Sequence, residues 1–437
     1  MQANSIGRRQ FLSGIAATAA SQALPHRVLG QTNRIIGAND RIRIGLIGAG
    51  SRGTEDLRSA LRQHNVECAA VADVFSLHRE RMKHTYPFID TYDDPRRLLD
   101  RKDIDAVINA TPLHVHSKYF LDTLSAGKDL YCEKTMTWNI PEAEACLRAA
   151  KASKQIVQIG LQDATAGSLL DAKDWIANGL TGKITMVESW MSRNTKHGVG
   201  QWRRPIPKEC TASNVNWKLF LDGRKLETFD AEKFINWRLY WSFSGGNTAE
   251  NMVHQLAWVI EAMNLPLPKA AAMTGGIFSV RDGREVPDTI SVTIEYPNDF
   301  VFVWQSVFNN KFYGMGERFL GSDGTIEHLS GSNNMITGPA DTSQDKESEE
   351  NAPGPVRYYP ETLNNPNGTP LLGKNPGENH MAHWVARLRD RKQPAASVEL
   401  GYRSALGVHM ANLSYRQKRR ITLEEALAMP ASAYLSH

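Results

Sequence analysis

A glycine-rich turn between a buried strand and a helix constrains this chain more than any other feature. Residues 43–53 read Arg-Ile-Gly-Leu-Ile-Gly-Ala-Gly-Ser-Arg-Gly, and the apolar run before the turn is typical of a strand buried on both faces. The spacing is G-x-G-x-x-G: Gly48 allows a tight turn, Gly50 lets a pyrophosphate approach the backbone, and Gly53 lets helix and strand pack closely. The N-terminus of the following helix attracts phosphate. The turn predicts a dinucleotide site, although a glycine turn between two core elements also fits these residues.

An acidic residue completes this pattern at the expected distance. The next predicted strand, 66–72, ends at Asp73, which lies 20 residues after Gly53, and the ribose-binding acid of such sites follows after about 20 residues. Its carboxylate accepts from ribose hydroxyls and repels a 2′-phosphate, so we expect NAD. NADP is the alternative, because Arg52 could reach such a phosphate. The expected cofactor contacts here are Gly48, Gly50, Ser51, Arg52, Gly53 and Asp73.

The chain of 437 residues is long enough for two domains. Residues 40–162 alternate strands and helices, which predicts an α/β Rossmann domain with a doubly wound parallel sheet. Residues 163–437 are predicted to form an α+β domain with an open-faced antiparallel sheet, because several runs alternate apolar and polar residues. Within it, 330–378 is predicted to be an irregular insertion rich in Gly, Pro, Asn and Ser, and the helices after it are expected to pack back on the Rossmann domain. The strands predicted in the first domain are 42–48, 66–72, 105–110, 129–133 and 156–161.

The N-terminal segment has the pattern of an export signal. Arg8 and Arg9 precede a short apolar stretch, so residues 1–35 are predicted to be a twin-arginine signal peptide and linker. This predicts contact with the twin-arginine translocase and a periplasmic or secreted protein; the alternative is a basic tail without a fold of its own. Residues 1–30 contain three arginines and no acid, and without them 48 basic residues stand against 47 acidic ones. With this balance we expect no nucleic-acid partner, and no apolar run is long enough to span a bilayer.

The cysteines give no sign of a metal site. None of the four lies in a C-x-x-C or Cys/His metal spacing. Three full disulfide pairings are open to them. We expect free thiols, because folding would precede export by the twin-arginine route. The cysteines are Cys68, Cys132, Cys146 and Cys210.

Two further clusters carry polar groups suited to chemistry. Lys134 comes directly after a predicted buried strand, where an unpaired lysine is unusual and where ligands of such sheets bind. Glu250 and His254 lie four residues apart on a predicted helix, and an acid so placed can orient and tune a histidine. A solvated lysine and a polar helix face are the plainer interpretations.

Taken in order, these features resemble the Gfo/Idh/MocA oxidoreductase family over residues 40 to about 415. The matching pieces are the glycine turn, Thr111-Pro112 with His116, Glu133-Lys134, Gly245-Gly246 and Glu250-x-Met252-x-His254. The resemblance implies a Rossmann domain followed by an open-faced sheet domain, and hydride transfer between a nicotinamide cofactor and a sugar, cyclitol or related polyol. Thr135 stands where the family has proline, Glu250 where it has aspartate, and Met252 where it has glycine.

The resemblance also implies roles for individual residues. Lys134 would face the substrate beside the nicotinamide, His254 would be the general base, and Glu250 the acid beside it. Because Lys134 and His254 come from different domains, the site is expected in the cleft between them. A homo-oligomer through the open sheet face is expected. Further cofactor contacts would be Thr111, Pro112, His116 and Glu133, and the candidate substrate contacts are Gln162, Arg193, Trp202, Arg203 and Trp237.

Two other functions remain open at this point. One is a glycoside hydrolase or lyase that uses bound NAD for a transient oxidation and forms no net NADH. The other is a sugar-binding protein that retains its cofactor without turnover. Three observations distinguish these functions. Stoichiometric NADH formation indicates the dehydrogenase, and product release without net NADH indicates the hydrolase or lyase. Ligand binding without turnover indicates the binding protein.

Overall fold

The computed structural model describes residues 41–195, 199–225, 228–311, 314–330, 353–360 and 371–434. Contacts join Ile42–His437 into one compact unit. The predicted export segment, residues 1–35, lies outside the described residues.

The first part of this unit is a six-stranded sheet whose strands are all parallel, in the order β3-β2-β1-β4-β5-β6. This is the strand order of a dinucleotide-binding Rossmann fold and confirms the predicted doubly wound sheet. Strand β3 was not predicted, because three residues at the sheet edge are too few to show a pattern. The strands are β1 Ile42–Ile47, β2 Val66–Ala72, β3 Asp90–Tyr92, β4 Ala106–Asn109, β5 Asp129–Cys132 and β6 Val157–Ile159, and the helices are α2 Ser51–Leu61, α3 Ser76–Thr85, α4 Pro95–Leu99, α5 His116–Ser125 and α6 Ile140–Ala152.

The second part is built on a nine-stranded sheet in the order β14-β13-β12-β11-β7-β10-β9-β8-β15. It is mixed rather than antiparallel throughout, because β7 and β10 run parallel with Val301 opposite Met186. Strand β13 lies within the predicted irregular insertion, where Arg357 and Tyr359 pair with β12 despite the turn-forming residues around them. The strands are β7 Ile184–Met191, β8 Ala270–Gly276, β9 Thr289–Tyr296, β10 Phe300–Val307, β11 Met315–Gly321, β12 Gly324–Ser330, β13 Pro353–Pro360, β14 Leu371–Leu372 and β15 Ile421–Thr422.

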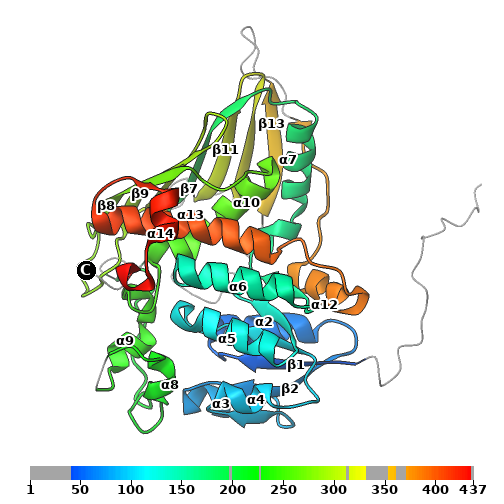
Figure 1. Ribbon diagram of the computed structural model, residues 1–437, viewed down its shortest axis with the longest axis vertical. Coiled ribbons are helices and arrows are strands. Elements are labelled where there is room, and N and C mark those ends of the chain that lie inside the picture. The colour runs from blue at the N-terminus through cyan, green and yellow to red at the C-terminus, as the bar shows by residue number, and fades with distance from the viewer. Residues whose placement is uncertain are drawn as a thin grey trace, which may run out of the picture. The chain divides into compact units, whose positions relative to one another are not determined.

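Helices cover one face of the nine-stranded sheet and connect it to the Rossmann domain. Helix α13, Val398–Gln417, contacts both β8 and α6 (Figure 1). Helix α10, Val253–Met263, lies beside α13, and their buried side chains Leu256 and Leu406 share a core with Ile294 of β9. Helix α12, His380–Asp390, instead packs on the Rossmann domain, where Trp384 joins the cluster that contains Leu46 of β1. The remaining helices are α7 Gly167–Ala177 and α14 Leu423–Ala428.

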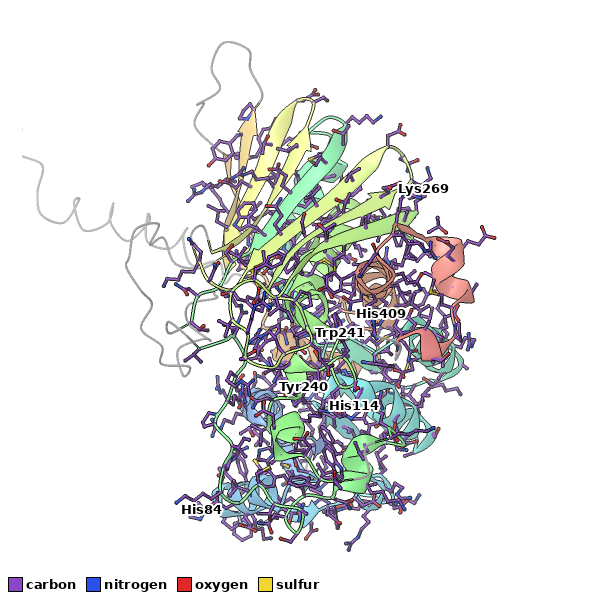
Figure 2. The ribbon with its side chains drawn as sticks, turned by 90° about the vertical axis from the view of Figure 1, so that its left-hand side faces the viewer. His84, His114, Tyr240, Trp241, Lys269 and His409 are labelled. Carbon is purple, nitrogen blue, oxygen red and sulfur yellow. The ribbon has the colours of Figure 1, made fainter. Side chains whose placement is uncertain are left out.

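Residues 199–225 and 228–245, which we call the return segment, pack back onto the Rossmann domain. Its helices α8, Trp217–Leu221, and α9, Ala231–Ile235, lie beside α3 rather than on the large sheet (Figure 1). Phe75, directly before α3, is buried among aromatic residues of this segment, including Phe220 and Phe234. The His114 ring packs against Phe220 and Phe243 of this segment, with ring centroids 5.0 and 4.9 Å apart. Figure 2 labels His114 together with Tyr240 and Trp241 of the same segment.

The described residues contain four free cysteines, as expected. Within those same ranges, no group of three His, Cys, Asp or Glu side chains could hold a metal ion. Nor does any helix described there have the length and apolarity needed to cross a membrane.

Candidate active site

The glycine turn has the shape that a pyrophosphate requires. Gly48 has φ +89°, a left-handed conformation, and a Cβ there would lie 2.7 Å from the Ala110 carbonyl oxygen. A Cβ on Gly53 would collide with the Gly48 carbonyl oxygen. A Cβ on Gly50 would meet no atom within 4 Å, so the backbone here faces open space at the N-terminus of α2. These residues fit a dinucleotide, which the glycine turn would hold by its phosphates.

Asp73 fixes the glycine turn to the end of β2. Its Oδ2 accepts from Ala49 N at 2.7 Å and its Oδ1 from Phe75 N at 2.8 Å, while His78 Nδ1 lies 3.1 Å from Oδ2. Burial alone would raise the pKa of Asp73, but His78 and the two N–H groups lower it overall. The side chain is therefore a carboxylate at neutral pH, as a ribose-binding acid must be.

Glu133 forms the centre of a buried polar cluster at the end of β5. Its Oε1 accepts from Gln162 Nε2 at 3.0 Å and Tyr131 OH at 3.3 Å, and its Oε2 accepts from Lys134 N at 3.2 Å. Asp56 of α2 was not singled out from the sequence, yet burial and then the neighbouring Glu133 raise its pKa well above the usual range. The Asp56 carboxyl therefore keeps its proton to a higher pH than an exposed aspartate does.

Lys134 joins the two parts of the unit. Its ammonium donates to the Glu250 carbonyl oxygen at 2.7 Å and lies 3.4 Å from Glu250 Oε2. Arg238, which the sequence did not single out, donates from Nε to the same Oε2 at 3.0 Å. Burial alone would raise the pKa of Glu250, but Lys134 and Arg238 lower it to about 2. The predicted acid is therefore an anion held between two cations.

The structure does not pair Glu250 with His254 as expected. Glu250 lies in a π turn, Thr248–Met252, which precedes α10, so the regular α-helical spacing assumed from the sequence does not apply. Its carboxylate contacts Lys134 and Arg238, and among the described residues none hydrogen-bonds the His254 imidazole. The sequence pattern does not predict the π turn. Such a turn contains one residue more than an α-helical turn, and packing against other elements decides where it forms.

His254 is partly buried in a strongly cationic setting. Burial lowers the pKa of His254 well below its ordinary value, and the nearby charges of Lys134, Arg52 and Arg193 act in the same direction. Burial likewise lowers the pKa of Lys134, with Glu250 opposing the shift. The imidazole is therefore neutral at physiological pH and able to accept a proton.

His116 links two loops. Its Nδ1 lies 2.8 Å from the Thr135 carbonyl oxygen and its Nε2 2.8 Å from that of Thr111, and the side chain is buried. Both ring nitrogens thus face backbone carbonyls, which leaves the ring without a nitrogen for the cofactor. Thr135 also donates from its hydroxyl to the Ala249 carbonyl oxygen at 2.7 Å, so the residue in the family's proline position contacts the π turn. Thr111 and Pro112 lie in the loop after β4, directly before η2, Leu113–Val115.

The candidate substrate residues are only partly brought together. Gln162 contacts Glu133, and Arg193 is close enough to His254 to lower its pKa. Arg203 is paired with Glu232 and Asp282, so its guanidinium supports a loop. Trp202 packs edge-on against Phe308 with ring centroids 5.0 Å apart, and Trp237 stacks with Arg238 at 4.4 Å.

Comparison with known proteins agrees with this geometry. Residues 42–161 match the family model described as "Oxidoreductase family, NAD-binding Rossmann fold", and residues 222–423 match that family's C-terminal alpha/beta domain. The chain belongs to the Gfo/Idh/MocA oxidoreductase family. Its first domain is therefore an NAD-binding Rossmann domain of this family, in line with the glycine turn and Asp73.

Individual relatives are more distant. The chain is 31% identical over 161 residues to an inositol 2-dehydrogenase of Gluconacetobacter diazotrophicus, which covers 36% of this chain and 47% of that protein. It is 23% identical over 342 residues to a glycosyl hydrolase family 109 protein of Stenotrophomonas maltophilia, covering 72% and 73%. The matches thus span about half of the first relative and most of the second.

A solved structure agrees in fold. The aldose-aldose oxidoreductase of Caulobacter crescentus, in complex with glycerol, superposes with a TM-score of 0.64 at 17% identity over 87% of this chain and 99% of that one. At this identity the likeness establishes the fold alone.

Proposed function

We propose that this protein transfers hydride between NAD and a secondary alcohol of a sugar, cyclitol or related polyol. The observation that carries the proposal is the contact between Lys134, at the end of β5, and the π turn that leads into His254. The Lys134 ammonium is close enough to the His254 imidazole to lower its pKa. Lys134 follows β5 at the carboxyl edge of the parallel sheet, where ligands of such folds bind. The inositol 2-dehydrogenase relative supports an alcohol substrate.

The chain's own groups account for the proton chemistry. Oxidation of a carbinol requires loss of the hydroxyl proton, and His254 accepts it because its imidazole is uncharged. The Lys134 ammonium donates to the same oxygen and stabilises the developing alkoxide. Glu250 holds Lys134 in place, and Arg238 holds the Glu250 carboxylate. When bound, the nicotinamide ring supplies the hydride acceptor, and in the reverse direction His254 returns the proton.

The proposal includes the cellular setting. Arg8 and Arg9 support export by the twin-arginine route to the periplasm or beyond. The partly exposed face of the nine-stranded sheet supports a homo-oligomer formed there.

A second candidate is a redox-neutral glycoside hydrolase. The match to the glycosyl hydrolase family 109 protein favours it, because that match covers 72% of this chain. In this reaction the alcohol would be oxidised, the glycosidic bond eliminated, water added and the carbonyl reduced again, so the hydride returns to the same sugar.

The stoichiometry of NADH separates the two. The cofactor of the native protein is first identified by mass spectrometry, and the protein with added NAD is then offered a panel of free sugars, cyclitols and aryl glycosides. We expect one NADH per alcohol oxidised, measured by absorbance and product analysis. Aglycone release without NADH would instead establish the hydrolase, and no reaction with either class would refute both.

A further inference from the structure

A loop of the return segment reaches the phosphate end of the cofactor site. Arg204 Nη1 lies 3.4 Å from Oγ of Ser51, although the two residues are 153 positions apart. Ser51 is the first residue of α2, an 11-residue helix that begins at the glycine turn. The guanidinium therefore lies where the glycine turn and the helix N-terminus would hold a pyrophosphate.

Asn236 holds the backbone of Arg204 from both sides. Its Oδ1 accepts from Arg204 N at 2.7 Å, and its Nδ2 donates to the Arg204 carbonyl oxygen at 3.2 Å. The Asn236 side chain is buried, so these two bonds are protected from water. The backbone position of Arg204 is thus set before any ligand arrives, while its exposed side chain stays accessible to a ligand.

The residues before Arg204 are fixed as well. The side chain of Arg284 is fully buried, donates to the Gln201 carbonyl oxygen at 3.0 Å and pairs with Asp282 at 2.8 Å. Arg203 pairs with the same Asp282. Trp202 has φ +69°, a left-handed conformation that is rare for a bulky residue. After this turn, Arg203 contacts Asp282 whereas Arg204 contacts Ser51.

The return segment is also attached to the Rossmann domain at the end of β2. Ser76 N donates to the Asn214 carbonyl oxygen at 2.9 Å, and Asn216 N donates to the Val74 carbonyl oxygen at 2.8 Å. Phe75 between them is buried in the aromatic cluster of this segment. The segment therefore has a fixed position relative to both Asp73 and the glycine turn.

We propose that Arg204 binds the pyrophosphate of the dinucleotide, so that the second domain completes the cofactor site. A guanidinium forms charge-assisted, bidentate hydrogen bonds to phosphate oxygens. The glycine turn supplies N–H donors from one side, and Arg204 supplies a full positive charge from the other. This assignment rests on NAD binding by the Rossmann domain and is independent of the sugar chemistry proposed above.

Titration calorimetry on the full chain tests it. Arg204→Ala should raise the Kd for NAD and for ADP-ribose by about 10- to 100-fold, the usual worth of hydrogen bonds to a charged group. Binding of adenosine, which lacks phosphate, should not change. Arg204→Lys should fall between wild type and alanine. Arg58→Ala, on an exposed position in the last turn of the same helix, is the matched control and should bind like wild type.

A salt series gives an independent measurement. The Kd for NAD should rise more steeply with ionic strength in the wild type than in Arg204→Ala, because the variant lacks one charge at the phosphate. If Arg204→Ala raises the Kd for adenosine as much as the Kd for NAD, the substitution only disturbs the loop. If the Kd for NAD does not change, Arg204 does not contact phosphate. Either outcome overturns the assignment, and neither depends on whether the protein oxidises a sugar.

Discussion

At the residue scale, the site is organised by how its cations are distributed. Lys134 and Arg238 share one carboxylate, that of Glu250. Lys134, Arg52 and Arg193 all act on His254, which has no such carboxylate in hydrogen-bond contact among the described residues. The same lysine therefore lowers the pKa of an acid on one side and keeps a base neutral on the other.

Replacing His254 by alanine should lower kcat by about 10² to 10⁴, which is the usual worth of general acid–base catalysis. The Kd for NAD should stay the same, because the glycine turn lies in the other domain. Steady-state kinetics and calorimetry measure the two. His84→Ala, on the exposed surface of α3 (Figure 2), is the control. A variant that loses thermal stability but keeps normal turnover per folded molecule would show that His254 only packs α10.

Replacing Lys134 by methionine should move the acid limb of the kcat/KM profile to higher pH. The nearby ammonium disfavours the imidazolium form, so its removal raises the pKa of His254 and makes the base protonate earlier as the pH falls. In the wild type the profile should stay flat through about pH 6.5, the ordinary histidine range. A limb that does not move in the variant, or moves to lower pH, would contradict the assigned base.

The two losses in kcat, for His254→Ala and Lys134→Met, should not add fully, because both groups act on one oxygen.

At the scale of elements, the π turn is the joint between the strand ends of the Rossmann domain and the large sheet. Its backbone carbonyls accept hydrogen bonds from the Lys134 ammonium and the Thr135 hydroxyl, and the Glu250 carboxylate in the turn accepts one from Arg238. Side chains that belong to different elements therefore meet at one turn. Removing the negative charge of Glu250 should therefore lower the free energy of unfolding of the whole unit.

Glu250→Gln should lower the free energy of unfolding by about 3–5 kcal/mol at pH 7, because it leaves two largely buried cations without their anion. The folded pKa of Glu250 is about 2 against an ordinary 4.5, so the stabilisation is complete above pH 4.5 and is lost as the pH falls toward 2. Urea unfolding at several pH values measures this. Wild type and variant should differ less as the pH falls through that window. A difference that is constant with pH would mean that the charge of Glu250 does not matter.

The sequence predicted those elements whose signal is local. The glycine turn, Asp73 and the alternating strands follow from spacing and periodicity, and they are found as predicted in the sheet. The parallel pairing of β7 with β10, the strand β13 and the π turn depend on distant partners, so no local pattern marks them. The same holds for Arg238 and Arg204, which enter the site only because the return segment folds back.

At the scale of the whole molecule, the cofactor site is assembled from both domains. The glycine turn and Lys134 belong to the first domain, whereas Glu250 and the loop of Arg204 belong to the second. Helix α12, late in the chain, packs on β1 and α2 of the first. A complete site therefore exists only when most of the chain has folded.

The twin-arginine route proposed above would carry the protein already folded, with this site assembled. Replacing Arg8 and Arg9 together by lysine should leave the precursor in the cytoplasm, because the translocase reads the arginine pair. Cell fractionation with an antibody to the folded unit measures the distribution, and Arg27→Lys, in the same segment but outside the pair, is the control. Wild-type protein recovered after export should carry NAD by mass spectrometry, since the site would close around the cofactor before translocation. Unchanged periplasmic accumulation of the double variant would contradict the assigned signal, and exported protein that takes up NAD only afterwards would contradict loading in the cytoplasm.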